Sequence, residues 1–149
     1  MPKNKNAGFT LIELLVVIAI IGILSSVVLA SLNTARGKGN DAKVKAQLSG
    51  LRASAEVYFD TNGNYGAAAS DLCTAAFFSD AASGMVQYTN QANYPTNATL
   101  ECRTDGAAYA VSAVLPGTPA GTGDNWCVDS LGKSKAIDAP LGAGVVICP

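Results

Sequence analysis

The sequence predicts an α+β fold in which one long N-terminal helix precedes a small antiparallel sheet. Two observations support this prediction. Residues 14–35 form an apolar run of 22 residues without a charged side chain. Beyond about position 106 the hydrophobic period changes from that of a helix to that of a strand. A helix followed by neighbouring strands is typical of α+β domains, in which the helix covers one face of the sheet.

The apolar run is long enough to cross a membrane. At a rise of about 1.5 Å per residue it spans about 33 Å, whereas the hydrocarbon core of a bilayer is about 30 Å thick. Glu13 stands at the edge of this run. A charge in such a segment costs roughly 2.5–3.5 kcal/mol on insertion scales and marks a functional residue by default. We therefore expect a membrane anchor over residues 9–35, with Glu13 as its functional side chain.

The next part of the helix, residues 36–59, is amphipathic. Gly37 and Gly39 each cost about 1 kcal/mol relative to alanine inside a helix. Two forms therefore remain open: a continuous helix with a weak joint, or a break at these glycines or at Gly22. The turn-forming cluster of residues 60–66 ends the helix. Larger apolar side chains recur at helical spacing and predict one buried stripe: Val44, Leu48, Leu51, Ala55 and Tyr58.

Residues 60–149 are expected to form a globular head. It begins with a connecting region that extends to about Gly106 and contains a short helix over residues 70–82. Alternating side chains then predict a strand from Tyr109 to Leu115, which Pro116 and Gly117 end. Three more strands are predicted, with a hairpin turn at residues 130–133: Asn125–Asp129, Ser134–Ile137 and Gly144–Cys148.

The four cysteines all follow the anchor, and none forms a C-x-x-C pair. Because the chain has no histidine, zinc or iron–sulfur ligation is poorly supported, and we expect neither a metal nor a cofactor. An even number of cysteines in a small exported head favours two disulfides. Four cysteines allow three connectivities. We favour Cys73–Cys102 and Cys127–Cys148, because each pair closes a nearby segment.

The segment GFTLIEL, residues 8–14, resembles the N-terminus of type IV pilins and related pseudopilins. The resemblance covers about the first 35 residues strongly and the next 25 loosely. It implies that a prepilin peptidase cuts between Gly8 and Phe9, removing the leader 1–8, and that the new amine of Phe9 is methylated. It also implies that Glu13 pairs with the Phe9 amine of a neighbouring copy. The implied partners are further copies of the chain, the peptidase and the assembly machinery of the inner membrane.

Three other interpretations of the N-terminal segment fit less well. A secretory signal, for which Val28-Leu29-Ala30 offers a cleavage site, usually has only 7–15 apolar residues without an acid. A simple one-span anchor leaves the cost of Glu13 unexplained. A buried helix of a soluble protein rarely contains a charge-free run of this length.

The orientation of the anchor involves two opposing signals. The basic residues beyond the span would by themselves place that flank in the cytoplasm, whereas the resemblance places the leader, with Lys3 and Lys5, inside. We follow the resemblance. The basic residues beyond the span are Arg36, Lys38, Lys43 and Lys45.

An enzyme is not supported by the sequence, and we assign no catalytic residue. Without histidine, a Ser/His or Cys/His nucleophile is impossible. Asp124, Asp129 and Asp138 do not have the spacing of an EF-hand calcium loop. After loss of the leader, 8 basic side chains stand against 11 acidic ones. This balance lacks the basic footprint that sequence-independent nucleic-acid binding needs.

The function expected from these features is that of a structural subunit of a type IV pilus-like filament serving adhesion, motility or DNA uptake. The precursor would reside in the inner membrane and the assembled filament at the cell surface. A pseudopilin of a type II secretion system is the first alternative, and a membrane-tethered binding module or enzyme is the second.

Overall fold

The computed structural model describes residues 9–66 and 69–149. It contains two compact units, Met1–Ala35 and Arg36–Pro149. The leader 1–8, and with it the cleavage-site residue Gly8, lies outside the described residues.

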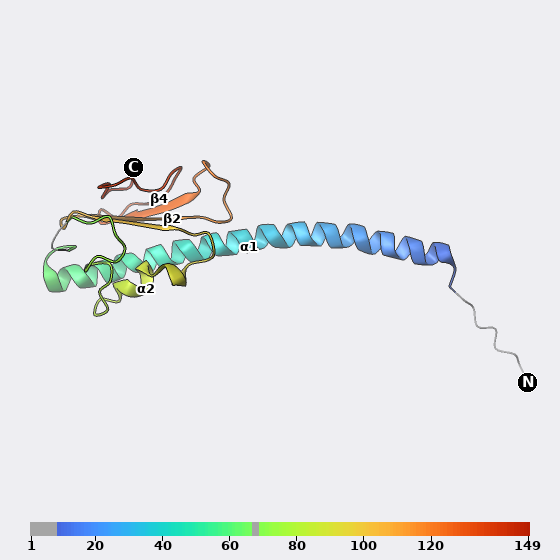
Figure 1. Cartoon of the computed structure of the whole chain (residues 1–149), viewed down its shortest axis with the longest axis horizontal. Coiled ribbons are helices and arrows are strands. Elements are labelled where there is room, and N and C mark those ends of the chain that lie inside the picture. The colour runs from blue at the N-terminus through green and yellow to red at the C-terminus, as the bar shows by residue number, and fades with distance from the viewer. Residues whose placement is uncertain (1–8, 67–68) are drawn as a thin grey trace, which may run out of the picture. The chain divides into compact units, whose positions relative to one another are not determined.

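Helix α1 extends from Leu11 to Asn62 without interruption (Figure 1, blue to green). The continuous form of the helix is therefore confirmed, and no break occurs at Gly22 or at Gly37 and Gly39. The helix ends with Gly63, whose φ of 69° is left-handed and whose N–H donates to the carbonyl oxygen of Phe59 at 2.7 Å. A glycine in this conformation is a common helix terminator, because it lacks the Cβ that would be strained there.

The predicted stripe of the second helical half is buried against the sheet of the head. Val44, Leu48, Leu51 and Ala55 have no exposed surface, and Tyr58 is half-buried beside them. They pack with aromatic side chains of the head, of which Phe77 and Tyr109 are almost completely buried. The amphipathic half of α1 is thus the core helix of the head, as its periodicity indicated.

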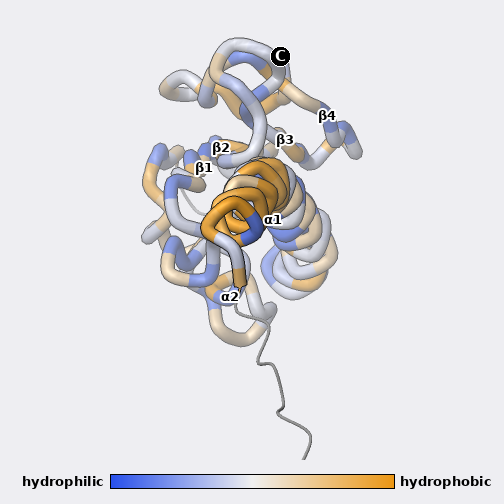
Figure 2. Tube along the Cα trace, turned by 90° about the vertical axis from the view of Figure 1, so that its right-hand side faces the viewer, coloured by the Kyte–Doolittle hydropathy of each residue, from blue (hydrophilic) through white to orange (hydrophobic). Residues whose placement is uncertain are grey.

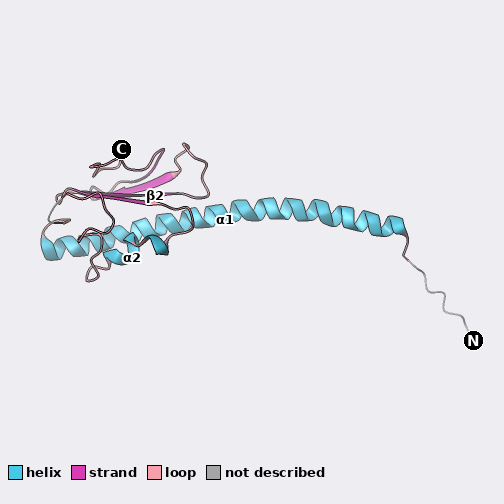
Figure 3. Ribbon diagram, in the orientation of Figure 1, coloured by secondary structure: helices cyan, strands magenta, loops and turns pink. Residues whose placement is uncertain are grey.

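The sheet is a four-stranded antiparallel meander in the order β1-β2-β3-β4. Its strands are coloured magenta in Figure 3. The α+β prediction is confirmed. Strands predicted at Tyr109, Asn125 and Ser134 correspond to β2, β3 and β4. The strand bounds are Leu100–Thr104 for β1, Tyr109–Val114 for β2, Asn125–Asp129 for β3 and Ser134–Ile137 for β4.

Two predictions for the connecting region are wrong. Strand β1 lies in the predicted connecting region, where no strand was expected, because Arg103 gives this segment a polar sequence. This arginine is buried, and its guanidinium donates to the carbonyl oxygens of Leu141 and Gly142 at 2.8 Å. The short helix over residues 70–82 is absent. The backbone of Ser70 instead pairs with Thr104 of β1, and Cys73 is bonded to Cys102. Helix α2, Met85–Thr89, and the 3-10 helix η1, Gln91–Asn93, follow instead.

The predicted strand over Gly144–Cys148 is also wrong. Gly144 has a left-handed φ of 69°, which interrupts an extended chain. Side chains, rather than a strand partner, hold this C-terminal tail. Asp71 accepts from the N–H of Gly144 at 2.9 Å, and Asp129 accepts from that of Cys148 at 2.9 Å. The tail is therefore fastened to the sheet without joining it.

Candidate site at the start of the anchor helix

The first turn of α1 is closed by a capping box. Thr10 immediately precedes the helix, and Glu13 is its third residue. The hydroxyl of Thr10 accepts from the N–H of Glu13 at 3.2 Å, and the Glu13 carboxylate accepts from the N–H of Thr10 at 2.9 Å. Each side chain thus satisfies an N–H that has no partner inside the helix. The helix N-terminus also favours a negative charge, because the backbone dipoles align there.

The capping box uses only one oxygen of the carboxylate. Glu13 Oε2 accepts both the N–H of Thr10 and its hydroxyl, the latter at 2.6 Å. Within residues 9–66 and 69–149 no donor reaches Oε1, and the side chain is exposed. Phe9, one residue before the cap, is 82% exposed. The arrangement therefore presents a fixed carboxylate with a free oxygen beside the predicted new N-terminus.

Sequence reasoning selected Glu13 but missed Thr10. The signal was present, since a threonine three residues before a glutamate and ahead of an apolar run is the capping-box pattern. Glu13 was interpreted only as a charge within an apolar segment. The structure adds that its carboxylate also starts the helix.

The rest of the anchor exposes apolar side chains on every side. Its large hydrophobic residues, from Phe9 to Leu32, are all at least 46% exposed. Figure 2 shows this part of α1 mostly in orange, the hydrophobic end of the scale. The helix is long and apolar enough to cross a membrane. A soluble monomer rarely exposes an apolar surface of this extent, and a surface of this kind is typical of a membrane or protein contact.

Three hydroxyl groups of the anchor are satisfied within the helix. Ser26 donates to the carbonyl oxygen of Ile23 at 2.8 Å, and Ser31 donates to that of Val27 at 3.0 Å. Thr34 donates to the carbonyl oxygen of Ala30 at 3.3 Å. Because hydrocarbon offers no hydrogen bonds, polar groups there must find partners inside the protein. These three side chains are thus compatible with lipid.

The four cysteines of the head lie in two disulfides. Cys73 is joined to Cys102, and Cys127 to Cys148, which are the pairs favoured from the sequence. The first disulfide connects the segment before α2 to β1. The second connects β3 to the C-terminal tail.

The acids considered for calcium bind backbone groups instead. Asp124 accepts from the N–H of Gly121 at 3.0 Å, and Asp138 accepts from that of Gly123 at 2.7 Å. Asp129 is fully buried and accepts from three backbone N–H groups. In the described part of the chain, no three potential metal ligands come together.

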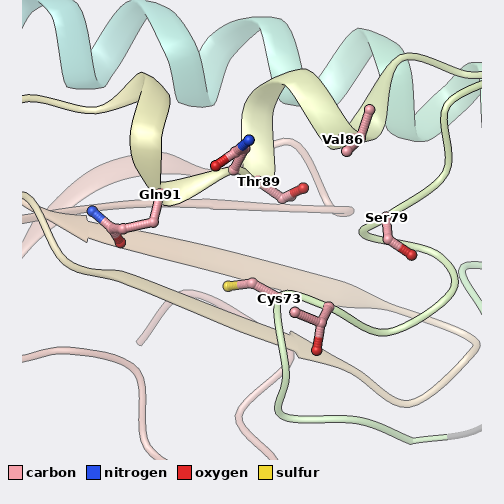
Figure 4. A pocket seen from close by; sticks show the side chains of 7 residues that line it. Cys73, Ser79, Val86, Thr89 and Gln91 are labelled. Carbon is pink, nitrogen blue, oxygen red and sulfur yellow. The ribbon is translucent and has the colours of Figure 1, made fainter.

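A cavity of about 350 Å³ lies beside Cys73 (Figure 4). Two of its polar side chains, Thr89 and Gln91, bind the protein's own backbone. Thr89 donates to the carbonyl oxygens of Phe78 and Met85. Gln91 donates to the carbonyl oxygen of Ala98 and accepts from the N–H of Leu100. We assign no ligand to this cavity.

A capped apolar helix with an acid in its first turn, continuing into the core helix of a small disulfide-bonded sheet domain, defines a protein with a prepilin-type N-terminus. The profile of the prokaryotic N-terminal methylation motif matches residues 3–29. The chain thus carries this motif, and its resemblance to type IV pilins and pseudopilins is confirmed.

Three relatives illustrate the similarity. The type IV wide pilus major component PilA4 of Thermus thermophilus is 48% identical over 62 residues, covering 41% of this chain and 47% of its own. The type II secretion system core protein G of Aeromonas hydrophila is 35% identical over 65 residues, 44% of this chain and 46% of its own. The type IV major pilin protein PilA of Myxococcus xanthus is 29% identical over 101 residues, 63% of this chain and 46% of its own.

The chain spans about half the length of the relatives that it matches. No solved structure matches it significantly.

Proposed function

We propose that this chain is a structural subunit of a type IV pilus-like filament. The precursor is anchored in the inner membrane by residues 9–35, and the assembled filament is exposed at the cell surface. Cleavage between Gly8 and Phe9 precedes assembly, and the new amine of Phe9 is methylated. The matched methylation motif and the two type IV pilus relatives support this proposal.

The observation that carries the proposal is the exposed apolar half of α1. Its large hydrophobic side chains are not covered by any other segment among residues 9–66 and 69–149. Lipid covers such a surface before assembly, and the equivalent helices of other copies cover it afterwards. Because one surface must fit both environments, side chains that are apolar on every side are favoured over a single stripe.

Glu13 provides the register of assembly. An unpaired carboxylate in an apolar environment is costly, so a cationic amine from a neighbouring copy relieves that cost. Oε2 remains in the capping box with Thr10, while Oε1 is free to accept the Phe9 amine of the neighbour. The pairing fixes the axial position of one helix against the next, because a displaced helix would leave both charges unpaired.

The roles of the relatives leave a second candidate. Similarity to core protein G of a type II secretion system supports a pseudopilin that forms a short periplasmic filament. Both candidates use the same cleavage, anchor and carboxylate. An antibody against the head that labels long surface filaments by electron microscopy supports the pilus subunit. Secretion that depends on the chain, without surface filaments, supports the pseudopilin.

Neither candidate is an enzyme. The relatives are named as pilus components and as a secretion-system core protein. A membrane-tethered enzyme is therefore the weaker proposal. Measurable catalytic turnover by the purified head would support it.

The test of the proposed assembly role uses Glu13→Ala and Glu13→Gln. Glutamine can keep the capping box but carries no charge, so it separates helix capping from charge pairing. We expect both variants to be inserted and cleaved, and both to form few or no filaments. Filaments are counted by electron microscopy beside immunoblots of the membrane pool. Normal filament numbers from Glu13→Gln would show that the charge is not the assembly determinant.

A further inference from the structure

Three basic side chains follow the apolar anchor without acidic partners. Arg36, Lys38 and Lys43 are exposed, and none takes part in an ion pair within the described ranges. We call these three residues the basic collar. Lys45 is not included, because its ammonium lies 4.5 Å from the centre of the Trp126 ring and is held by that contact.

The one acid in this stretch of the helix is bound by the head and not by these basic side chains. Between residues 14 and 55 the only acidic residue is Asp41. Its side chain is buried, with 8% of the residue exposed. The carboxylate accepts from the N–H of Gly117 at 2.7 Å and from the hydroxyl of Thr118 at 2.9 Å. The Asp41 carboxylate is thus hydrogen-bonded to the loop between β2 and β3. The exposed charged side chains of residues 36–43 are therefore all basic.

The collar surrounds the helix rather than occupying one face. At 100° per residue, Arg36 and Lys43 lie on nearly the same side, and Lys38 lies on the opposite side. A protein partner that docks on one face would meet only part of this set. A planar surface through which the helix passes would meet all of it.

The position of the collar along the chain indicates that this planar surface is the membrane interface. Arg36 directly follows the last residue of the charge-free run, and Lys38 follows two residues later. The headgroup layer of a bilayer is roughly 5–7 Å deep on each side. One helical residue rises about 1.5 Å, so Arg36 and Lys38 fall within this layer, and Lys43 lies about 10 Å beyond Arg36. Long basic side chains can extend toward the interface from such positions.

We propose that the basic collar binds the anionic headgroups of the membrane that holds the anchor. The inference rests on the proposed function, since it requires the anchor to lie in a bilayer. The collar holds the subunit at a fixed depth before assembly, and each subunit gives up these headgroup contacts when it enters a filament. Cleavage of the leader removes Lys3 and Lys5, which leaves the collar as the basic flank of the span.

The test uses the full chain in nanodiscs of phosphatidylcholine mixed with phosphatidylglycerol. Native mass spectrometry after partial removal of lipid counts each lipid retained by the protein. The test variant is Arg36→Gln/Lys38→Gln. The charge-matched control is Arg52→Gln/Lys135→Gln, which removes two cations from the head outside the collar. Thermal melting followed by circular dichroism verifies that both variants fold.

We expect the wild-type chain to retain phosphatidylglycerol preferentially. A cation near an anionic surface changes this preference about fivefold, so the test variant should lower it roughly 25-fold, with little change in the control. Adding Lys43→Gln should lower it further. Salt at 1 M should abolish the preference, because the Debye length falls to about 3 Å.

Other outcomes overturn the inference. Equal phosphatidylglycerol retention by the wild type and the test variant would show that the collar does not recognise the headgroup. Unchanged lipid preference with loss of self-association would assign the collar to a contact between copies. Failure of the wild-type chain to insert into phosphatidylcholine alone would defeat the anchor itself, and thereby the proposed function.

Discussion

Asp129 Oδ2 accepts a hydrogen bond from the backbone N–H of Cys148 at 2.9 Å, directly beside the disulfide that joins Cys148 to Cys127. The other oxygen, Oδ1, accepts from the N–H groups of Leu131 and Lys133 at 3.0 and 2.9 Å. One buried carboxylate therefore shapes the β3–β4 hairpin and also holds the C-terminal tail. Backbone N–H groups, rather than a basic side chain, compensate its charge.

Replacing Asp129 by alanine should destabilise the head strongly. Hydrogen bonds to a charged group contribute about 1.5–3 kcal/mol each, and the variant leaves buried N–H groups without a partner. We expect a loss of about 3–5 kcal/mol in the free energy of unfolding, measured by urea denaturation. Asp138→Ala is the control, because this exposed acid makes one bond, to Gly123, and should cost less than about 1 kcal/mol. Equal losses from the two variants would contradict this role of Asp129.

The close approach of Gly117 to Gly37 leads to a second prediction, which concerns the stability of the head. A Cβ on Gly117 would lie 2.7 Å from Gly37 Cα and nearer still to the carbonyl group of Gly37. Gly117→Ala should therefore push the β2–β3 loop off the helix, break its bond to Asp41 and cost about 1–3 kcal/mol. Gly39→Ala meets no atom within 4 Å and should stabilise the helix by up to about 1 kcal/mol. Denaturation curves that move both variants in the same direction would refute this distinction.

Substitutions at Thr10 test helix capping separately from the charge of Glu13. Thr10→Val removes the hydroxyl that accepts from the N–H of Glu13, whereas Thr10→Ser keeps it. Loss of a cap costs about 0.5–2 kcal/mol. We therefore expect Thr10→Val to loosen the first turn and slow assembly, with Thr10→Ser near wild type. Amide hydrogen exchange in residues 11–14 measures the first effect, and filament counts measure the second. Undiminished protection in Thr10→Val would show that the cap is dispensable.

The stability of the head should fall at high pH. Burial, together with the hydrogen bond to Glu56, raises the pKa of Tyr65 to about 12, and burial raises the pKa of Tyr109 as well. An unfolded tyrosine has a pKa near 10. The folded state thus favours the neutral phenols, and their contribution is complete below about pH 10. It is lost as the pH rises from about 10 through about 12. Urea denaturation across this range measures the loss.

Tyr109→Phe isolates one of these phenols. The hydroxyl of Tyr109 is buried and has no hydrogen-bond partner among the described residues. Removing it should leave the stability at neutral pH unchanged or slightly higher, since an unsatisfied buried group is itself costly. It should also make the alkaline loss shallower. A large loss of stability at neutral pH would reveal a hydrogen bond to this hydroxyl.

The two disulfides can be tested chemically. Peptide mapping without reduction should recover Cys73 with Cys102 and Cys127 with Cys148. Chain-entropy arguments assign about 3–4 kcal/mol to loops of such lengths, a model-dependent value. Cys127→Ser/Cys148→Ser should lower the free energy of unfolding by about that amount. Recovery of four free thiols from the exported protein would exclude both bonds.

Periodicity was sufficient for α1 and for three of the four strands. The stripe from Val44 to Ala55 repeats at helical spacing, and the alternation in β2 has one interpretation. Strand β1 was not predicted, because Arg103 is charged yet buried. The carbonyl groups of Leu141 and Gly142, to which it donates, lie far away in the sequence. Glu101 and Asp71 pair with this charge, but a local pattern cannot reveal the distant backbone carbonyls that hold the buried guanidinium. The predicted last strand failed for a related reason, since Asp129 fixes the tail from outside its own segment.

The N-terminal site was only partly predictable. A lone acid beside an apolar run selects Glu13, because its cost demands an explanation. The glycine pair at Gly37 and Gly39 was interpreted through helix propensity alone. That argument could not reveal that Gly37 faces the backbone of Gly117, 80 residues later, whereas Gly39 faces no neighbour. Close packing between distant segments requires the structure.

Both disulfides join segments that follow the end of α1, so neither attaches the head covalently to the helix other than through the chain itself. Mechanical tension along a filament of such subunits would therefore travel through the helices and bypass both cross-links. The head would resist separation from a loaded helix only through non-covalent contacts, among them the buried Val44-to-Ala55 stripe, the Asp41 contact with the β2–β3 loop and the hydrogen bond from Tyr65 to Glu56. If these contacts were lost, the disulfides would limit how far the segments after α1 could unfold.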